Sequence, residues 1–303
     1  MKNITYLFLL LSCMACKNSP KEVDKPNILW ISHEDLGPIY GCYGDEYANT
    51  PTIDQLAANS IKFTQVYSNA PICAPARSTL ITGMYAVSLG TQHLRSAIPV
   101  PEQLKILPEV LREAGYYTSN NVKTDYNFSH EGRWDESSKE AHWRNRPEGK
   151  PFFSVFNFMI THEGPTNALR PEDTSSLPTH HDPAKAVLPP HLPDSPKMRE
   201  IWAHMYDLLE VFDGQVKDLL SQLEEDGLLE ETIVLFLQTM DMVCQGTSAG
   251  LIMLDYKSLL FYMFQINTNI WWKAFLEQHP IGWSALLILR LLRLPWPESI
   301  FRK

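Results

Sequence analysis

One cysteine stands in a run of residue types that together could bind and transfer an anionic group. The run reads Cys73-Ala-Pro-Ala-Arg77-Ser-Thr-Leu-Ile-Thr-Gly83. A helix that begins near Pro75 puts Arg77 one turn along, where its guanidinium can neutralise negative charge. The free N–H groups at the start of such a helix are further donors for an anion. The alternative interpretation is a buried cysteine in an ordinary helix.

The spacing of this run, with proline two residues and arginine four residues after the cysteine and then Leu80-x-Thr82-Gly83, resembles the signature of the type I sulfatases. In that family the cysteine is converted to formylglycine. The resemblance implies a hydrated aldehyde at position 73, of which one hydroxyl attacks sulfur and the other later expels sulfate by collapsing back to the aldehyde. It also implies Cys73 and Arg77 as catalytic residues, and a formylglycine-generating or sulfatase-maturating enzyme as a partner.

A pair of acidic residues, Glu34 and Asp35, follows directly after the first apolar run of the chain. Type I sulfatases have a similar Asp-Asp pair at this place, which binds calcium. The resemblance therefore implies calcium as cofactor, with Glu34, Asp35 and Cys73 as its ligands. Glu34 departs from the family pattern, but its longer carboxylate is still a hard oxygen ligand for the flexible calcium shell. Outside this context, two such residues would be a solvated loop.

Four more polar residues follow predicted strands or the signature helix. Lys123, in NNVKTDYNF, resembles the sulfate-binding lysine of the family, and His162, in FMITHE, resembles its histidine beside the leaving-group oxygen. The resemblance implies catalytic roles for both. His93 and Arg95, in GTQHLRS, are candidate substrate contacts. The alternative is that each is an ordinary polar loop residue.

The resemblance covers residues 27 to about 239. Within it, the strings GCYGD, GTQHLRS, NNVKTDYNF, WDES and AHWRNR are most similar to the bacterial relatives of N-sulfoglucosamine sulfohydrolase (heparan N-sulfatase). The implied activity is hydrolysis of O-sulfate or N-sulfate groups on sulfated glycans. Two other functions stay open. One is a catalytically impaired remnant or glycan binder, and the other is a phosphoester or phosphonate hydrolase of the same superfamily.

The elements that must position these residues alternate in type. Apolar or alternating runs predict strands at 27–32, 61–69, 116–122, 151–160 and 232–238. Helices are predicted at 50–60, with Thr50 as cap, at 102–115 and at 198–225, and residues 165–196 are predicted to form a surface excursion. The pattern predicts an α/β fold, a mostly parallel sheet flanked by helices, and the resemblance implies the alkaline-phosphatase-like sulfatase N-terminal domain. Ligands in such folds bind at the carboxyl ends of the strands.

The composition and net charge of the chain limit its fold class and the kinds of partner that it can bind. The 303 residues are 44% hydrophobic and 20% charged, which excludes a disordered chain, a collagen or a coiled coil. The net charge of -9 argues against nucleic acid as a partner. An anionic substrate must therefore be held by a local positive site.

The first sixteen residues are predicted to be an export signal. Lys2 precedes a short apolar run, which is too short to span a bilayer. Small residues precede Cys13 and Cys16 as in bacterial lipoprotein signals, and Cys16 is the preferred lipidation site. Residues 17–26 would form a tether and 27–239 a partial catalytic domain, exported and anchored in the cell envelope, at the periplasm or cell surface. The alternative is a plain secretory signal with incidental cysteines.

The character of the chain changes at residue 240. The family pattern continues with Asp-His-Gly and then a lysine, but this chain reads Met240-Asp-Met-Val-Cys-Gln-Gly, and four of its eight tryptophans lie beyond residue 270. A membrane hairpin is one alternative, although the uncharged runs are shorter than the roughly 20 residues of a spanning helix.

A frameshift accounts for this change better. With permitted synonymous codons, a one-base shift turns residues 240–251 into HGYGVPRHKRWL and residues 278–292 into ATPNRLVSFVDFAPT, both of which resemble the family. We therefore predict that residues 240–303 are an aberrant, frameshifted tail without a fold of its own. The catalytic domain would then be incomplete at its C-terminal side, with an exposed sheet edge beside residues 232–238.

Overall fold

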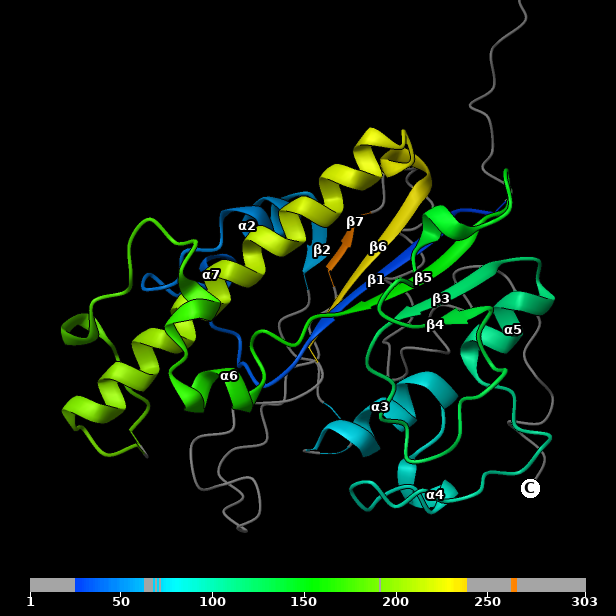
Figure 1. Ribbon diagram of the computed structural model, residues 1–303, viewed down its shortest axis with the longest axis horizontal. Coiled ribbons are helices and arrows are strands. Elements are labelled where there is room, and N and C mark those ends of the chain that lie inside the picture. Colours follow the sequence, from blue (N-terminus) through cyan, green and yellow to red (C-terminus); the bar gives the residue numbers. More distant parts are fainter. Residues whose placement is uncertain are drawn as a thin grey trace, which may run out of the picture.

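The described part of the chain forms three layers, with a sheet between two groups of helices (Figure 1). The computed structural model describes residues 25–62, 68, 70, 72–190, 192–238 and 263–265. The predicted leader up to residue 16 and most of the tether and of the predicted tail lie outside these residues. The predicted α/β fold with a mostly parallel sheet is confirmed.

The sheet has seven described strands, in the order β2-β7-β6-β1-β5-β3-β4. Five neighbouring strands, β6-β1-β5-β3-β4, are parallel, and β1 is the fourth of the seven strands in the sheet. Short β7 pairs antiparallel with both β6 and β2. The bounds are β1 Asn27–His33, β2 Ser60–Lys62, β3 Tyr117–Asn121, β4 Glu136–Ser137, β5 Phe152–Asn157, β6 Thr232–Gln238 and β7 Met263–Gln265.

Helices cover both faces of this sheet (Figure 1). Helices α2 and α7 lie on one side, and α3, α4 and α5 lie on the other. The bounds are α2 Pro51–Ala58, α3 Cys73–Thr82, α4 Ala86–Leu89, α5 Leu107–Glu113, α6 Glu163–Ala168 and α7 Pro196–Glu225. Five 3₁₀ turns complete the described elements: Gly41–Tyr43, Trp143–Asn145, Pro171–Thr174, Pro183–Lys185 and Leu229–Glu231.

The central strand β1 explains why an unbroken apolar run forms a strand here. Successive side chains of a strand point to opposite faces of the sheet. Leu29 and Ile31 pack in the core on the α7 side, whereas Ile28 and Trp30 pack in the core on the α3 side. All seven residues of β1 are buried. Both faces therefore need apolar side chains, which removes the polar alternation of a half-exposed strand.

Several predicted boundaries differ from the structure. Strand β5 ends at Asn157, so residues 158–160 leave the sheet toward the site. Helix α5 begins only at Leu107 because proline lacks an N–H group and is tolerated in the first turn of a helix but not in its interior, so Pro108 must lie near the start. Helix α3 begins at Cys73, not near Pro75. The predicted excursion contains helix α6 and two 3₁₀ turns.

Thr50 is the N-cap residue of α2, and Pro51 is its first helical residue, as predicted, but the Thr50 side chain makes no capping hydrogen bond. The N–H groups of Thr52 and Ile53 instead donate to the carboxylate of Asp213 on α7, at 3.1 and 2.8 Å. The prediction of an exposed sheet edge at β6 was wrong, because β7, from the segment predicted to lack structure, pairs with β6 over three residues.

Candidate active site

Six of the residues that the sequence singles out lie in one cluster at the carboxyl ends of the strands. Glu34 and Asp35 come directly after β1, Lys123 follows β3, and His162 follows β5. Cys73 and Arg77 come from the first turns of α3. The parallel arrangement of β1, β3 and β5 brings these ends to the same edge of the sheet.

Glu34 lies at the centre of the cluster and is 1% exposed. Its carboxylate forms an ion pair with the Lys123 ammonium, and its Oε1 lies 3.5 Å from Nη1 of Arg77. The Nε2 atom of His162 lies 3.7 Å from the Glu34 Oε2 and 3.8 Å from the Asp35 Oδ2. Lys123 and Arg77 thus face one buried carboxylate, and they are the two basic side chains of the cluster that an anion could contact.

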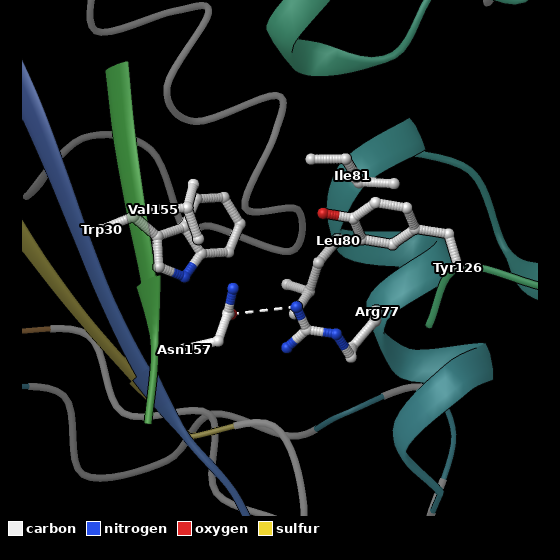
Figure 2. A pocket seen from close by; sticks show the side chains of 7 residues that line it. All are labelled: Trp30, Arg77, Leu80, Ile81, Tyr126, Val155 and Asn157. Atoms are coloured by element: carbon white, nitrogen blue, oxygen red, sulfur yellow. Dashed lines mark hydrogen bonds between the residues drawn. The ribbon is translucent and has the colours of Figure 1, made fainter. Parts of the chain in front are cut away.

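Arg77 is held on several sides, and Figure 2 shows its hydrogen bond with Asn157. Its Nε donates to the Thr124 carbonyl at 2.9 Å, and its Nη2 donates to the Lys123 carbonyl at 2.8 Å and to the Asn157 Oδ1 at 2.9 Å. The guanidinium is 4% exposed and lies 5.8 Å from the centre of the Tyr126 ring. These contacts fix the orientation of the charge as well as its place.

Cys73, the first residue of α3, is a 6% exposed free cysteine. Burial raises the pKa of its thiol to about 12, with the carboxylates of Glu34 and Asp125 adding to the rise and Lys123 opposing it. An unmodified Cys73 is therefore a neutral thiol at pH 7, and a neutral thiol is a weak nucleophile.

Asp35 has the properties of a cation ligand. Its backbone has a left-handed φ of 63°, and its Oδ2 accepts from the N–H of Glu163 at 2.7 Å. Its Oδ1 is buried and has no hydrogen-bond partner among the described residues. Burial raises the pKa of Asp35 to about 6; His162 opposes the rise and Glu34 adds to it. A buried carboxylate with a free oxygen fits a bound cation, since a buried polar group ordinarily has a partner.

The fit to calcium is partial. Glu34 and Asp35 offer the hard oxygens that calcium prefers, but calcium takes about six to eight oxygen ligands. Within the described residues, no group of three or more histidine, cysteine, aspartate or glutamate side chains is arranged to hold a metal ion. The segment in which the family pattern expects Asp-His-Gly begins at residue 240 and lies outside the described residues.

His93 and Arg95 are not part of the cluster contacts that the structure describes. Both side chains are exposed, in the loop after α4, and Arg95 has a φ of 55°. The backbone carbonyl of His93 accepts from the Asn127 amide at 2.8 Å, so the described contact of His93 is made by its main chain. The structure thus brings six of the eight candidates together and leaves these two outside.

Two residues that the sequence analysis did not single out belong to the cluster. Asp125 contacts Cys73, and its Oδ2 lies 3.7 Å from the Lys123 ammonium. Asn157, the last residue of β5, contacts Arg77. Asp125 follows β3 two residues after Lys123, and this place in the chain was a signal that could have identified it, whereas nothing in the local sequence marks Asn157.

The layered α/β fold, with this cluster at the carboxyl ends of its parallel strands, is of the alkaline-phosphatase-like class. Residues 26–140 match the family model described as Sulfatase. The chain is 35% identical over 282 residues to an ulvan-active sulfatase of Formosa agariphila, which covers 74% of this chain and 47% of that protein. The chain belongs to the sulfatase family, and it spans less than half the length of this relative.

Solved structures agree on the fold. A 2-O GAG sulfatase superposes with a TM-score of 0.66 at 18% identity, over 90% of this chain and 72% of the other. The phosphonate monoester hydrolase of Agrobacterium radiobacter superposes with a TM-score of 0.59 at 15% identity, over 80% and 68% of the two chains. At such identities the likeness concerns the fold alone.

Proposed function

We propose that this chain is the N-terminal part of a sulfatase that removes O- or N-sulfate groups from sulfated glycans. The observation that carries the proposal is the meeting of Cys73, at the N-terminus of α3, with Lys123 and Arg77 around Glu34. A nucleophile position, two cations and free helix N–H groups at one buried point suit a transferring anion.

The roles of the residues follow from their places. The Lys123 ammonium, 12% exposed, is the cation that can reach a sulfate oxygen. Arg77 neutralises charge that develops at position 73, one helical turn away, while its other N–H groups stay bonded to main-chain carbonyls. His162, 23% exposed and beside both carboxylates, is placed to donate a proton to the leaving oxygen of the sugar.

Two groups complete the proposal. The formylglycine made from Cys73 would supply the geminal-diol nucleophile, and calcium, held on one side by Glu34 and Asp35, would supply positive charge to the sulfuryl group. The buried, neutral thiol of Cys73 and the unpartnered Oδ1 of Asp35 support these assignments.

The substrate class is taken from the relatives. An ulvan-active sulfatase of Formosa agariphila and an N-acetylgalactosamine-6-O-sulfatase of Bacteroides thetaiotaomicron both act on sulfated sugars by name. We propose a sulfated polysaccharide or its fragments as the substrate, which the exposed His93 and Arg95 could contact outside the cluster.

Sulfate release tests the proposal. The chain, co-expressed with a sulfatase-maturating enzyme and supplied with calcium, is incubated with sulfated oligosaccharides and with aryl sulfate and aryl phosphate esters. We expect sulfate release that Cys73→Ala abolishes. Faster hydrolysis of the phosphate ester would favour a phosphonate or phosphoester hydrolase, which the fold of the Agrobacterium radiobacter enzyme keeps open. Glycan binding without release would indicate an impaired remnant.

We also propose export and anchoring through a lipid on Cys16. The sequence of the first sixteen residues supports this, and none of the described helices is long and apolar enough to cross a membrane. Palmitate labelling that Cys16→Ser abolishes is the expected result. Labelling that only Cys13→Ser abolishes would move the lipid site, and no labelling would leave simple secretion.

A further inference from the structure

The side chain of Asn157 joins the three elements that carry the cluster. It lies at the carboxyl end of β5 and is 8% exposed. Its Oδ1 accepts from Ser32 Oγ of β1 at 2.6 Å and from Arg77 Nη2 of α3 at 2.9 Å. Its Nδ2 donates to the Asn120 Oδ1 at 3.0 Å, to the Asn121 carbonyl at 3.2 Å and to the Lys123 carbonyl at 3.0 Å.

These contacts use the full capacity of an amide, which has two acceptor lone pairs and two N–H donors. They also fix its orientation, because a flipped amide would point its N–H groups at Arg77 and its oxygen at three other oxygens. Aspartate has the same shape but would place a second oxygen against those three. The position thus requires an amide, with an acceptor on one side and a donor on the other.

The Lys123 carbonyl accepts hydrogen bonds from both Arg77 and Asn157. It accepts from Arg77 Nη2 at 2.8 Å and from Asn157 Nδ2 at 3.0 Å, while Asn157 Oδ1 holds the same Arg77 nitrogen. The three groups form a closed ring of contacts, and Figure 2 shows the Asn157–Arg77 side of it. A shift of Asn157 therefore moves the Arg77 guanidinium and the Lys123 main chain together.

We propose that Asn157 is a positioning residue, which sets the guanidinium of Arg77 and the loop of Lys123 at a fixed separation so that both cations meet one sulfate group. The assignment rests on the proposed function, since it is for a transferring sulfate that the two cations must be spaced. A displacement of about 1 Å of such groups can reduce the rate about 100-fold.

The chain offers a matched control. Asn27, at the opposite end of β1, is 7% exposed, and its Oδ1 accepts from the Phe152 N–H at 3.2 Å. Asn27→Asp and Asn157→Asp are thus the same change at two buried asparagines that both join β1 to β5. Asn27 lies far from the cluster, whereas Asn157 lies within it. Thermal unfolding of both variants separates a loss of stability from a loss of sulfate binding.

The experiment compares wild type, Asn157→Asp and Asn27→Asp by thermal unfolding, by calorimetric binding of inorganic sulfate, and by kcat and KM on an aryl sulfate after maturation. We expect Asn157→Asp to bind sulfate at least tenfold more weakly and to lose about 100-fold in kcat. Asn27→Asp should stay within twofold of wild type in both. If Asn157→Asp does not fold, Asn157→Gln, which keeps the amide but displaces it by one methylene, replaces it with the same expected direction.

Each other outcome has a definite meaning. Sulfate affinity and kcat that stay within twofold in the Asn157 variant, or fall equally in the Asn27 variant, overturn the assignment and leave the proposed function standing. A wild type that hydrolyses no sulfate ester overturns the proposed function, while a selective loss of sulfate binding in Asn157→Asp still supports the positioning role. A wild type that neither binds sulfate nor hydrolyses an ester overturns both.

Discussion

The Arg77 guanidinium donates to three oxygens in different directions, so its shape should matter as much as its charge. A lysine keeps the charge but cannot reproduce the planar set of donors. We expect Arg77→Lys to lower kcat about 100-fold, close to the effect of losing one oriented donor for developing charge. Steady-state kinetics on an aryl sulfate measures kcat. The control is Arg112→Lys, in the last turn of α5. Unchanged kcat in Arg77→Lys would contradict the role.

Cys73 carries the second prediction at this scale. Peptide mass spectrometry after co-expression with a maturation enzyme should show the mass loss of thiol-to-aldehyde conversion at Cys73 and none at Cys42, which is also a free cysteine. Only Cys73 stands before the Pro75 and Arg77 of the signature. An intact thiol at Cys73 under these conditions would count heavily against the formylglycine mechanism.

At the scale of elements, one carboxylate joins two helices. Asp213 of α7 accepts from the Thr52 and Ile53 N–H groups, which lie in the first turn of α2. Loss of a helix cap reduces stability by about 1 kcal/mol. We expect Asp213→Ala to lower the free energy of unfolding by about that amount in urea denaturation. Asp213→Asn, which keeps an acceptor, should lose less; an equal loss in both would mean that charge and not capping matters.

A second carboxylate of α7, that of Asp207, binds the predicted surface excursion, residues 165–196, to the helix. Asp207 accepts from the N–H of His181 at 2.8 Å and contacts the rings of His180 and His181 at 2.9 and 2.7 Å. Burial acts to raise the pKa of Asp207, but the hydrogen bonds from His181 and His180 outweigh it and hold the pKa below the ordinary 3.8.

A depressed acid pKa adds stability above the unfolded-state value, and that stability is lost as the pH falls through the folded-state value. The free energy of unfolding should therefore fall as the pH drops from about 5 to 3. Asp207→Asn should be less stable than wild type by about 2 kcal/mol at pH 7 and should show a shallower fall. Denaturant titrations across this range measure both, and parallel pH curves would exclude Asp207 as the cause.

Local patterns predicted the strands that line the core but not the contacts between distant segments. The apolar runs of β1 and β6 were recognisable because both faces of these strands are buried. The sequence identifies Thr50 as the N-cap residue of α2, but nothing in the local sequence indicates that a carboxylate from residue 213 accepts from the first turn of the helix. The sequence does not indicate a role for Asn157 for the same reason. An asparagine at a strand end is significant only through its contacts with Arg77 and Lys123, which the fold brings close to it.

At the scale of the molecule, the proposed calcium site and the predicted frameshift together lead to a prediction. Among the described residues, Glu34 and Asp35 would supply only one side of a calcium shell, which takes about six to eight oxygen ligands. Restoring the frame before Met240 should therefore raise calcium affinity and sulfatase activity by orders of magnitude, measured by calcium titration and sulfate release. Resequencing the locus around this codon is the direct check. Tight calcium binding and full activity of the unrepaired chain would show that residues 240–303 are a genuine part of the enzyme.

The place of β1 in the sheet also determines when the sheet can be completed during synthesis of the chain. Strand β1 lies between β5 and β6, so the sheet around the cluster stays incomplete until Thr232–Gln238 has been made, which begins 159 residues after Cys73. At roughly 5–20 residues per second, a ribosome needs about 8–30 s for that stretch. For this interval the cysteine is part of a growing chain that has not closed over it. The order of the strands along the chain thus sets the time in which the proposed maturation enzyme could reach an uncovered Cys73.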